Sequence, residues 1–293
     1  MESFINYSEK IGNNFLLCQG PGGNTSIKIE NKVLIKKSGY LLSDSKNKNI
    51  FKKVMLKDIK SFYEKINDEN KFDKSLSIET PLHVLLNSKY IFHYHSIASI
   101  LISAIYKKNT LDSELIKNKI LPIKYIRPGV DLANEITRNN KDYNFKSFFL
   151  YNHGIVIEDD NVENLYKKIL FTENIFSKLI DYKKLKVVAR EVLNLEIENN
   201  RIRNIYPNIE YKKFKDKFLF PDHPVFFPDS FKYDGDYIYL NKKLNSVELI
   251  YFKTLLILYI LIGDNKIENF IKKETGRKLR SSEDEQLRIR LNK

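Results

Sequence analysis

Histidine is scarce in this chain, and its placement constrains the fold more than any other feature. The 293 residues contain five histidines, and four of them lie in two short patches, His83, His93, His95 and His153. Glu79 lies just before the first patch, and the second patch is Asn152-His153-Gly154. Imidazole and carboxylate groups bind zinc and similar divalent ions. We therefore expect a fold that brings the two patches together around a metal ion.

The residues around these histidines predict the elements that carry them. Pro81 suits a first helical turn, so residues 79–88 are predicted to be helical, with Glu79 and His83 on one face. Residues 90–95 have the period of a strand, so His93 and His95 would project to the same side. Three neutral imidazoles from His93, His95 and His153 would leave a fourth position for substrate, as catalytic zinc sites require. Glu79 could then act as a general base.

The role of His83 has two readings. It could support the metal ligands from outside the site, or it could be a helix residue that is satisfied locally. The second reading is the one we favour, because a lone histidine on an apolar helix face is more often part of a core.

The rest of the first 185 residues alternates between helix and strand patterns. Predicted helices cover residues 5–18, 97–106, 130–137 and 162–184, and predicted strands cover 26–30, 32–36, 147–151 and 155–157. This alternation is typical of an α/β sandwich. A glycine-rich turn over residues 20–26 could hold an anion through free N–H groups and hydroxyls, or it could simply lead into the hairpin.

The sequence changes character after about residue 186. Residues 218–229 are rich in aromatic residues and proline, 246–263 predict a buried helix, and the charged end, 272–293, predicts a frayed helix or tail. We therefore divide the chain into residues 1–188 and a C-terminal extension, 189–293. The extension could cover the mouth of the active site near His223, or it could only contribute to an oligomer.

Composition excludes several classes of protein. One cysteine, Cys18, allows no disulfide within the chain and favours a reducing compartment, and no signal peptide is recognisable, so we expect a cytoplasmic protein. The longest apolar run, residues 254–263, is too short to span a bilayer. The chain has 50 basic and 37 acidic residues, and the basic residues are scattered along the sequence without forming a stripe. We therefore expect an anionic small molecule as the partner and not nucleic acid.

Six motifs, taken in order, resemble the class II aldolase/adducin family. They are Gly20-Pro21-Gly22-Gly23-Asn24-Thr25-Ser26, Lys37-Ser38-Gly39, Glu79-Thr80-Pro81-Leu82-His83, His93-Tyr94-His95-Ser96, Arg127-Pro128-Gly129 and Asn152-His153-Gly154. With Phe-Pro-Asp-His near residue 220, the pattern looks closest to the aldolase portion of proteins that fuse an aldolase to a short-chain dehydrogenase. No Gly-x-x-x-Gly-x-Gly follows a strand, so these residues predict no dehydrogenase part.

The resemblance implies a three-layer α/β/α sandwich and a homo-oligomer, a cyclic tetramer being favoured. It implies Zn²⁺, or another divalent metal, on His93, His95 and His153, with Glu79 at the acid/base position. Tyr125 matches a tyrosine that acts in the neighbouring subunit's site. Positions that hold the substrate are matched by Gly23, Asn24, Ser38, Gly39 and Ser77.

Two departures bear on the substrate. Ile78 and Pro21 stand where many phosphate-binding members have hydroxyl residues, so fewer donors are available for a phosphate. The function that the resemblance implies is a lyase that cleaves a sugar or sugar phosphate by retro-aldol chemistry through a metal-stabilised enediolate. An epimerase, a dehydratase or a decarboxylase could use the same site. The adducin branch lacks the zinc histidines and serves as a scaffold, so a non-catalytic interaction protein is the alternative of another class.

Overall fold

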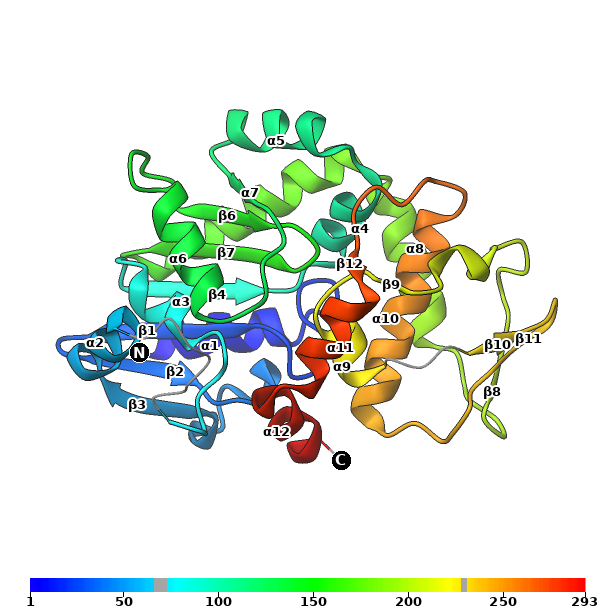
Figure 1. Cartoon of the computed structure of the whole chain (residues 1–293), viewed down its shortest axis with the longest axis horizontal. Coiled ribbons are helices and arrows are strands. Elements are labelled where there is room, and N and C mark those ends of the chain that lie inside the picture. Colours follow the sequence, from blue (N-terminus) through cyan, green and yellow to red (C-terminus); the bar gives the residue numbers. More distant parts are fainter. Residues whose placement is uncertain (66–72, 228–230, 293) are drawn as a thin grey trace.

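A seven-stranded sheet forms the centre of the computed structural model, which describes residues 1–65, 73–227 and 231–292 (Figure 1). Neighbouring strands are antiparallel except for the last pair, which is parallel. Across the sheet the order is β3 (Phe51–Met55), β2 (Lys32–Lys36), β1 (Asn24–Ile29), β4 (Tyr90–Tyr94), β7 (Gly154–Asp159), β6 (Ser147–Leu150) and β5 (Leu121–Ile123).

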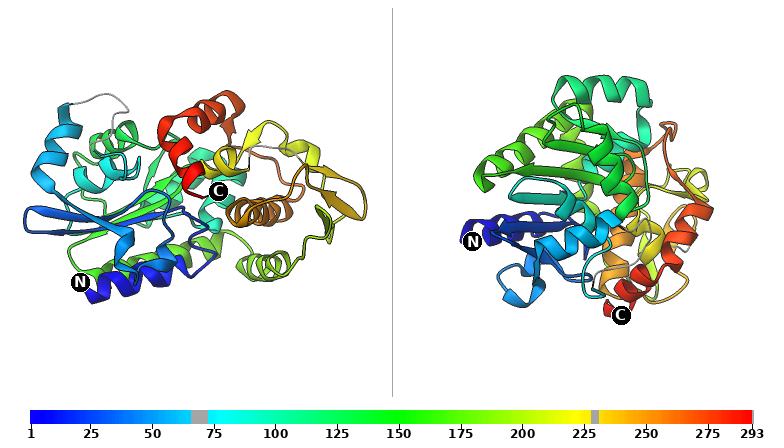
Figure 2. Two further views of the ribbon diagram at one scale, coloured as in Figure 1. Left: turned by 90° about the horizontal axis from the view of Figure 1, so that it is seen from below. Right: turned by 60° about the vertical axis from the view of Figure 1, so that its left-hand side comes forward.

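Helices cover both faces of this sheet, as Figure 2 shows from below. One face packs against α1 (Glu2–Gly12), α4 (Ile97–Ile105) and α7 (Val162–Leu179). The opposite face packs against α2 (Leu56–Lys65), α3 (Thr80–Leu85) and α6 (Val130–Asn139). A further helix, α5 (Lys108–Lys117), lies beside β5 at the sheet edge. The predicted α/β/α sandwich is therefore confirmed. Strands β4 and β6 are buried along their whole length because helices cover them on both sides.

The remainder of the chain adds a helical layer with two small sheets. Its helices are α8 (Tyr182–Leu193), α9 (Asp222–Phe226), α10 (Ser246–Ile262), α11 (Lys273–Ser281) and α12 (Glu283–Leu291). The small sheets contain β8 (Arg201–Arg203), β10 (Lys232–Tyr233) and β11 (Tyr237–Tyr239), and β9 (Lys217–Phe218) with β12 (Ile271–Lys272). The boundary predicted between residues 188 and 189 lies inside α8, and the division into two domains stays a prediction.

Helix α10 joins this layer to the sandwich. Asn245 and Glu248 form a capping box at its start, in which each side chain accepts a hydrogen bond from the other residue's backbone N–H. The helix is apolar on nearly all sides, which is the pattern of a buried helix. It packs against α4 and α8 within the same apolar core. None of the described helices is both long and apolar enough to cross a membrane.

Two predicted elements differ from the structure. The single helix expected over residues 162–184 is divided into α7 and α8, because Ile180 is extended and Asp181 caps the N-terminus of a new helix. The frayed tail expected over 272–293 is wrong: α11 and α12 are two ordered helices. Leu279 and Glu285 are buried, because α11 packs on α9 and α12 closes over the sheet ends.

A core substitution in α10 tests whether the C-terminal layer and the sandwich share one core. Leu255→Ala should lower the free energy of unfolding by about 2–5 kcal/mol, because it removes a fully buried side chain. The matched control, Leu170→Ala on the exposed face of α7, should change it by about 0.5 kcal/mol or less. Urea unfolding followed by circular dichroism and by tyrosine fluorescence would measure both. Two separate transitions, with only one of them shifted, would contradict the shared core.

Candidate metal centre

Strand pairing brings the two histidine patches together. His93 is in β4 and His95 follows its last residue, while His153 immediately precedes β7. Because β4 and β7 are antiparallel neighbours, with His93 opposite Val156, the end of one strand lies beside the start of the other. The three imidazoles therefore meet at the same edge of the sheet. Glu79 reaches this edge from the N-terminus of α3, where Ser77 Oγ accepts its backbone N–H at 3.2 Å.

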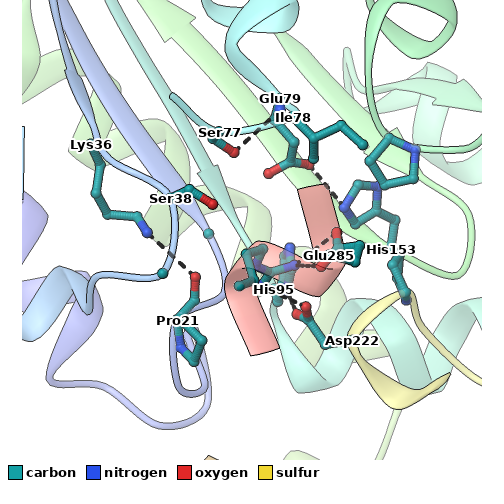
Figure 3. Close-up of a pocket in the computed structure, with 15 residues that line it drawn as sticks. Pro21, Lys36, Ser38, Ser77, Ile78, Glu79, His95, His153, Asp222 and Glu285 are labelled. Carbon is teal, nitrogen blue, oxygen red and sulfur yellow. Dashed lines mark hydrogen bonds and ion pairs between the residues drawn. The ribbon is translucent and has the colours of Figure 1, made fainter. Parts of the chain in front are cut away.

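The four side chains converge on one point. One donor atom from each of Glu79, His93, His95 and His153 can be chosen so that all lie within 4.8 Å of one another. Oε1 of Glu79 lies 3.1 Å from Nε2 of His93. It also lies 3.1 Å from Nε2 of His153, and Figure 3 shows these two side chains facing each other. All four residues are buried. The structure thus brings together the predicted metal ligands and the predicted base.

The tautomers of the imidazoles indicate what this point can hold. Nδ1 of His93 lies 3.0 Å from the carbonyl oxygen of Ile155, which can only accept, so Nε2 of a neutral His93 carries a lone pair. Nδ1 of His95 lies 2.9 Å from a carboxylate oxygen of Asp222, at ion-pair distance but without hydrogen-bond alignment, and a proton on this Nδ1 would likewise leave a lone pair on Nε2. These two Nε2 atoms are 2.9 Å apart. Two facing lone pairs repel unless a cation or a proton lies between them, so the donors fit a divalent ion.

The pKa shifts within the cluster bear on whether it can bind a divalent ion. Burial opposes the charge on Glu79, but His93 and the hydrogen bond with His153 hold its pKa well below the usual range. Burial also opposes a charge on His93, yet the Glu79 carboxylate raises the pKa of His93 above its ordinary value. Burial lowers the pKa of His153 to about 4, which keeps that imidazole neutral. An ionised carboxylate beside a neutral imidazole is the state that binds a metal, and a proton on His93 would compete with the ion.

His83 lies apart from the cluster. It is fully buried on α3, and its Nδ1 is 2.9 Å from Oγ of Ser26 in β1. Burial lowers the pKa of His83 to about 3. The structure agrees with the reading that we favour, a core residue of the helix: Nδ1 of His83 is bound to Ser26, whereas Nε2 has no hydrogen-bond partner among the described residues.

Four of the five predicted substrate residues line a cavity beside the cluster, and Asn24 does not. Gly23, Ser38, Gly39 and Ser77 line it together with Ile78, and its volume is about 20 Å³, room for about one water molecule (Figure 3). Ser38 Oγ is buried without a hydrogen-bond partner among the described residues. The same holds for both amide atoms of Asn24, which follows Gly23 in the chain. These groups are free to bind a polar ligand.

Tyr125 does not line this cavity. It follows β5 and faces a separate groove of about 270 Å³ that Tyr151 and Phe270 also line. Burial, with Glu285 nearby, raises the pKa of Tyr125, and its hydroxyl has no hydrogen-bond partner among the described residues. Its role in the site of a neighbouring subunit stays a prediction.

Four charged residues of the site carry no signal that sequence analysis detected: Lys36, Asp222, Glu285 and Arg288, all of which line the cavity. Lys36 comes from β2 and donates to the carbonyl oxygens of Tyr40 at 2.7 Å and Pro21 at 3.3 Å. Burial lowers the pKa of Lys36 to about 8. The other three come from α9 and α12, which the sequence did not connect with the histidines. The motif Phe-Pro-Asp-His contained the one usable hint, but it drew attention to His223 instead of the adjacent aspartate.

Comparison with known proteins agrees with the site. A family model described as the class II aldolase and adducin N-terminal domain matches residues 3–180, more than half of the chain and all four converging side chains. The chain belongs to the class II aldolase and adducin family. The matched part is an aldolase-type enzyme domain, whereas α8 to α12 lie beyond the match.

Individual relatives are distant. YuxG of Bacillus subtilis (strain 168), named as an uncharacterised oxidoreductase, is 27% identical over 193 residues, which is 58% of this chain and 28% of YuxG. The chain therefore spans less than a third of that relative's length, in agreement with the predicted similarity to one portion of a longer fusion protein.

Two solved structures are similar to part of this chain. The N-terminal class II aldolase domain of a conserved protein from Thermoplasma acidophilum matches with a TM-score of 0.53 and 24% identity, over 60% of this chain and 92% of that one. An L-fuculose-1-phosphate aldolase from Thermus thermophilus matches with a TM-score of 0.46 and 13% identity, over 62% and 93%. The first likeness supports the fold of the sandwich.

Removing two imidazoles tests the metal centre. The double variant His93→Ala/His95→Ala should bind far less than one divalent ion per chain, because one imidazole and one carboxylate remain. His83→Gln, a buried histidine outside the cluster, is the control and should keep the parent's metal content. Elemental analysis after dialysis against zinc would measure both. An unchanged metal load in the double variant would exclude this site.

Proposed function

We propose that this chain is a metal-dependent lyase that cleaves a sugar or a sugar phosphate by retro-aldol chemistry. The observation that carries the proposal is the convergence of the Glu79 carboxylate with three imidazoles at one buried point. Buried ionisable groups lower the free energy of unfolding unless a partner compensates their charge. A protein that serves only as a scaffold would gain nothing from such a cluster. Zinc is the metal we favour, since imidazole-rich sites with an open position suit it.

The metal and the carboxylate have separate tasks in this proposal. A divalent ion held by His93, His95 and His153 supplies a Lewis acid that stabilises negative charge on substrate oxygens. Glu79 holds the proton that moves to and from the carbon next to the substrate carbonyl. Its low pKa keeps it ionised, and its position beside two imidazoles places it next to any group bound there. The enclosing core keeps bulk water away, which strengthens these electrostatic interactions.

The polar end of the cavity suggests how the rest of the substrate is held. Ser38 has an unsatisfied hydroxyl group and lines the cavity together with Lys36, whose ammonium group is buried. Such a set would bind a phosphate or the hydroxyl groups of a sugar. Ile78 lines the same cavity and offers no donor. We therefore propose a sugar or sugar phosphate, with weaker phosphate binding than a hydroxyl residue at position 78 would give.

The assembly belongs to the proposal as well. Tyr125 would donate a proton to the aldehyde oxygen in the site of a neighbouring subunit, as the family resemblance implies. A homo-oligomer, with a tetramer favoured, and a cytoplasmic location remain predictions.

Glu79→Gln tests the base. Loss of the carboxylate should slow exchange of the carbon-bound protons of dihydroxyacetone phosphate or dihydroxyacetone by about 10²–10⁴-fold, the usual contribution of a positioned general base. The exchange can be followed by NMR in D₂O with metal-loaded protein. Glu64→Gln, at an exposed position of α2, is the matched control and should exchange at the parent rate.

The exchange experiment tests the role of Glu79 and the lyase activity separately. Undiminished exchange with Glu79→Gln would exclude Glu79 as the base. If the parent protein neither exchanges these protons nor releases an aldehyde from any ketose or ketose phosphate in a panel, the lyase proposal is wrong.

Ile78→Ser tests the phosphate end of the cavity. A hydroxyl there should lower the KM for a phosphorylated ketose relative to its unphosphorylated form by about tenfold, since a hydrogen bond to a charged group contributes about 1.5–3 kcal/mol. The ratio of the two KM values is the measurement, and Ile116→Ser, half exposed on α5, is the control. An equal effect on both substrates would show that position 78 does not face a phosphate.

A further inference from the structure

The C-terminal extension places one carboxylate directly on a predicted metal ligand. Oδ2 of Asp222, at the start of α9, lies 2.9 Å from Nδ1 of His95, on the opposite side of the ring from the cluster (Figure 3). The two atoms are within ion-pair distance, although their alignment is not that of a well-directed hydrogen bond. Asp222 is 1% exposed. A carboxylate buried to this extent needs a compensating partner, and His95 alone is neutral when it coordinates a metal.

Arg288 supplies that compensation from α12. Its Nη2 donates to Oδ1 of Asp222 at 2.8 Å, and its Nη1 donates to the Glu285 carboxylate at 2.8 and 3.1 Å. The guanidinium lies 5.2 Å from the centre of the Phe226 ring, which fixes its plane. Arg288 therefore joins the two carboxylates, and its bond to Oδ1 of Asp222 leaves Oδ2 facing the imidazole.

The glycine-rich turn leaves room for this pair. A Cβ atom on Gly22 would lie 2.9 Å from Nδ1 of His95 and 3.1 Å from Oδ2 of Asp222, closer than side chains tolerate. The same turn is tied to the extension by Tyr251 of α10, whose hydroxyl donates to the Gln19 carbonyl at 3.0 Å. The sandwich and the extension are thus fitted to each other at the contact between His95 and Asp222.

We propose that Asp222 and Arg288 are positioning residues for the metal centre, so that the sandwich depends on its C-terminal extension to bind the ion tightly. Asp222 holds the proton of His95 on Nδ1 and fixes the ring plane, which leaves Nε2 free to coordinate. Carboxylates behind metal-binding imidazoles act in this way, and their loss typically weakens metal binding by about 10–100-fold. Arg288 does not contact His95 and acts indirectly, by holding Asp222 in place through a hydrogen bond.

This inference rests on the metal centre of the proposed function, and metal affinity tests it without any substrate. Asp222→Asn keeps the shape of the side chain but removes its charge, so the dissociation constant for Zn²⁺ should rise by about 10–100-fold. The full-length chain would compete for zinc with a chromophoric chelator at fixed pH. The absorption bands of the Co²⁺-loaded protein would report a change in the His95 ligand that a docking role alone would not produce.

Two further variants keep the test decisive if Asp222→Asn folds poorly. Arg288→Gln leaves Asp222 in place and should weaken zinc binding by about tenfold, the lower end of the same range. Glu274→Gln is the matched control: its carboxylate lies on the exposed surface of α11, where it pairs with Lys278 at 2.8 Å, and the variant should bind zinc like the parent. Unfolding temperatures measured without metal would report any loss of docking separately.

The possible results lead to distinct conclusions. Weaker zinc binding and altered Co²⁺ bands with Asp222→Asn or Arg288→Gln, but not with Glu274→Gln, would support the positioning role. Parent-like zinc affinity in the folded Asp222 and Arg288 variants would overturn it, whatever their stability. If the parent itself binds no divalent ion, the metal centre of the proposed function falls instead.

Discussion

The antiparallel pairing of β4 with β7 is the constraint on which the site depends. A strand that ends in His93 and His95 lies beside a strand that begins after His153, and the register places the three rings at one edge of the sheet. A slip of one residue in this register would turn His93 to the other face. The long buried segments on both strands prevent such a slip, because it would also move their apolar side chains out of the two cores.

The C-terminal extension also contacts the residues that carry the imidazoles at this edge of the sheet. Asn152, the residue before His153, donates through its amide to the carbonyl oxygens of Leu219 and Asn269, both at 3.1 Å. Asp222 contacts His95 from the other side of the cluster. Two of the three imidazoles are therefore held, directly or through a neighbour in the chain, by residues outside the part that matches the family model. The extension is structurally continuous with the centre that it surrounds.

The sequence was sufficient for the sandwich and the histidine cluster but not for the groups behind it. Period-2 segments, Pro81 and the spacing of the motifs are local signals, and the elements they predict are present with shifts of a few residues. Helix α3, for example, ends at Leu85 instead of Ser88. Asp222 reaches His95, and Arg288 joins Asp222 to Glu285, only through tertiary packing of two short helices. No local pattern records that packing, and the charged composition of residues 272–293 suggested a solvated tail. In the structure Arg288 lies between the carboxylates of Asp222 and Glu285, and it compensates the charge of both buried groups.

Helix α12 also forms part of the wall around the predicted substrate residues. Leu291 lies against Gly39, so close that a Cβ on this glycine would be 2.9 Å from the leucine side chain, and the Asn292 amide donates to the Gly39 carbonyl at 3.3 Å. Glu285 and Arg288 of the same helix line the cavity, which has room for about one water molecule. A ligand larger than water therefore needs some part of this wall to move, and such a motion is a step distinct from proton transfer at Glu79.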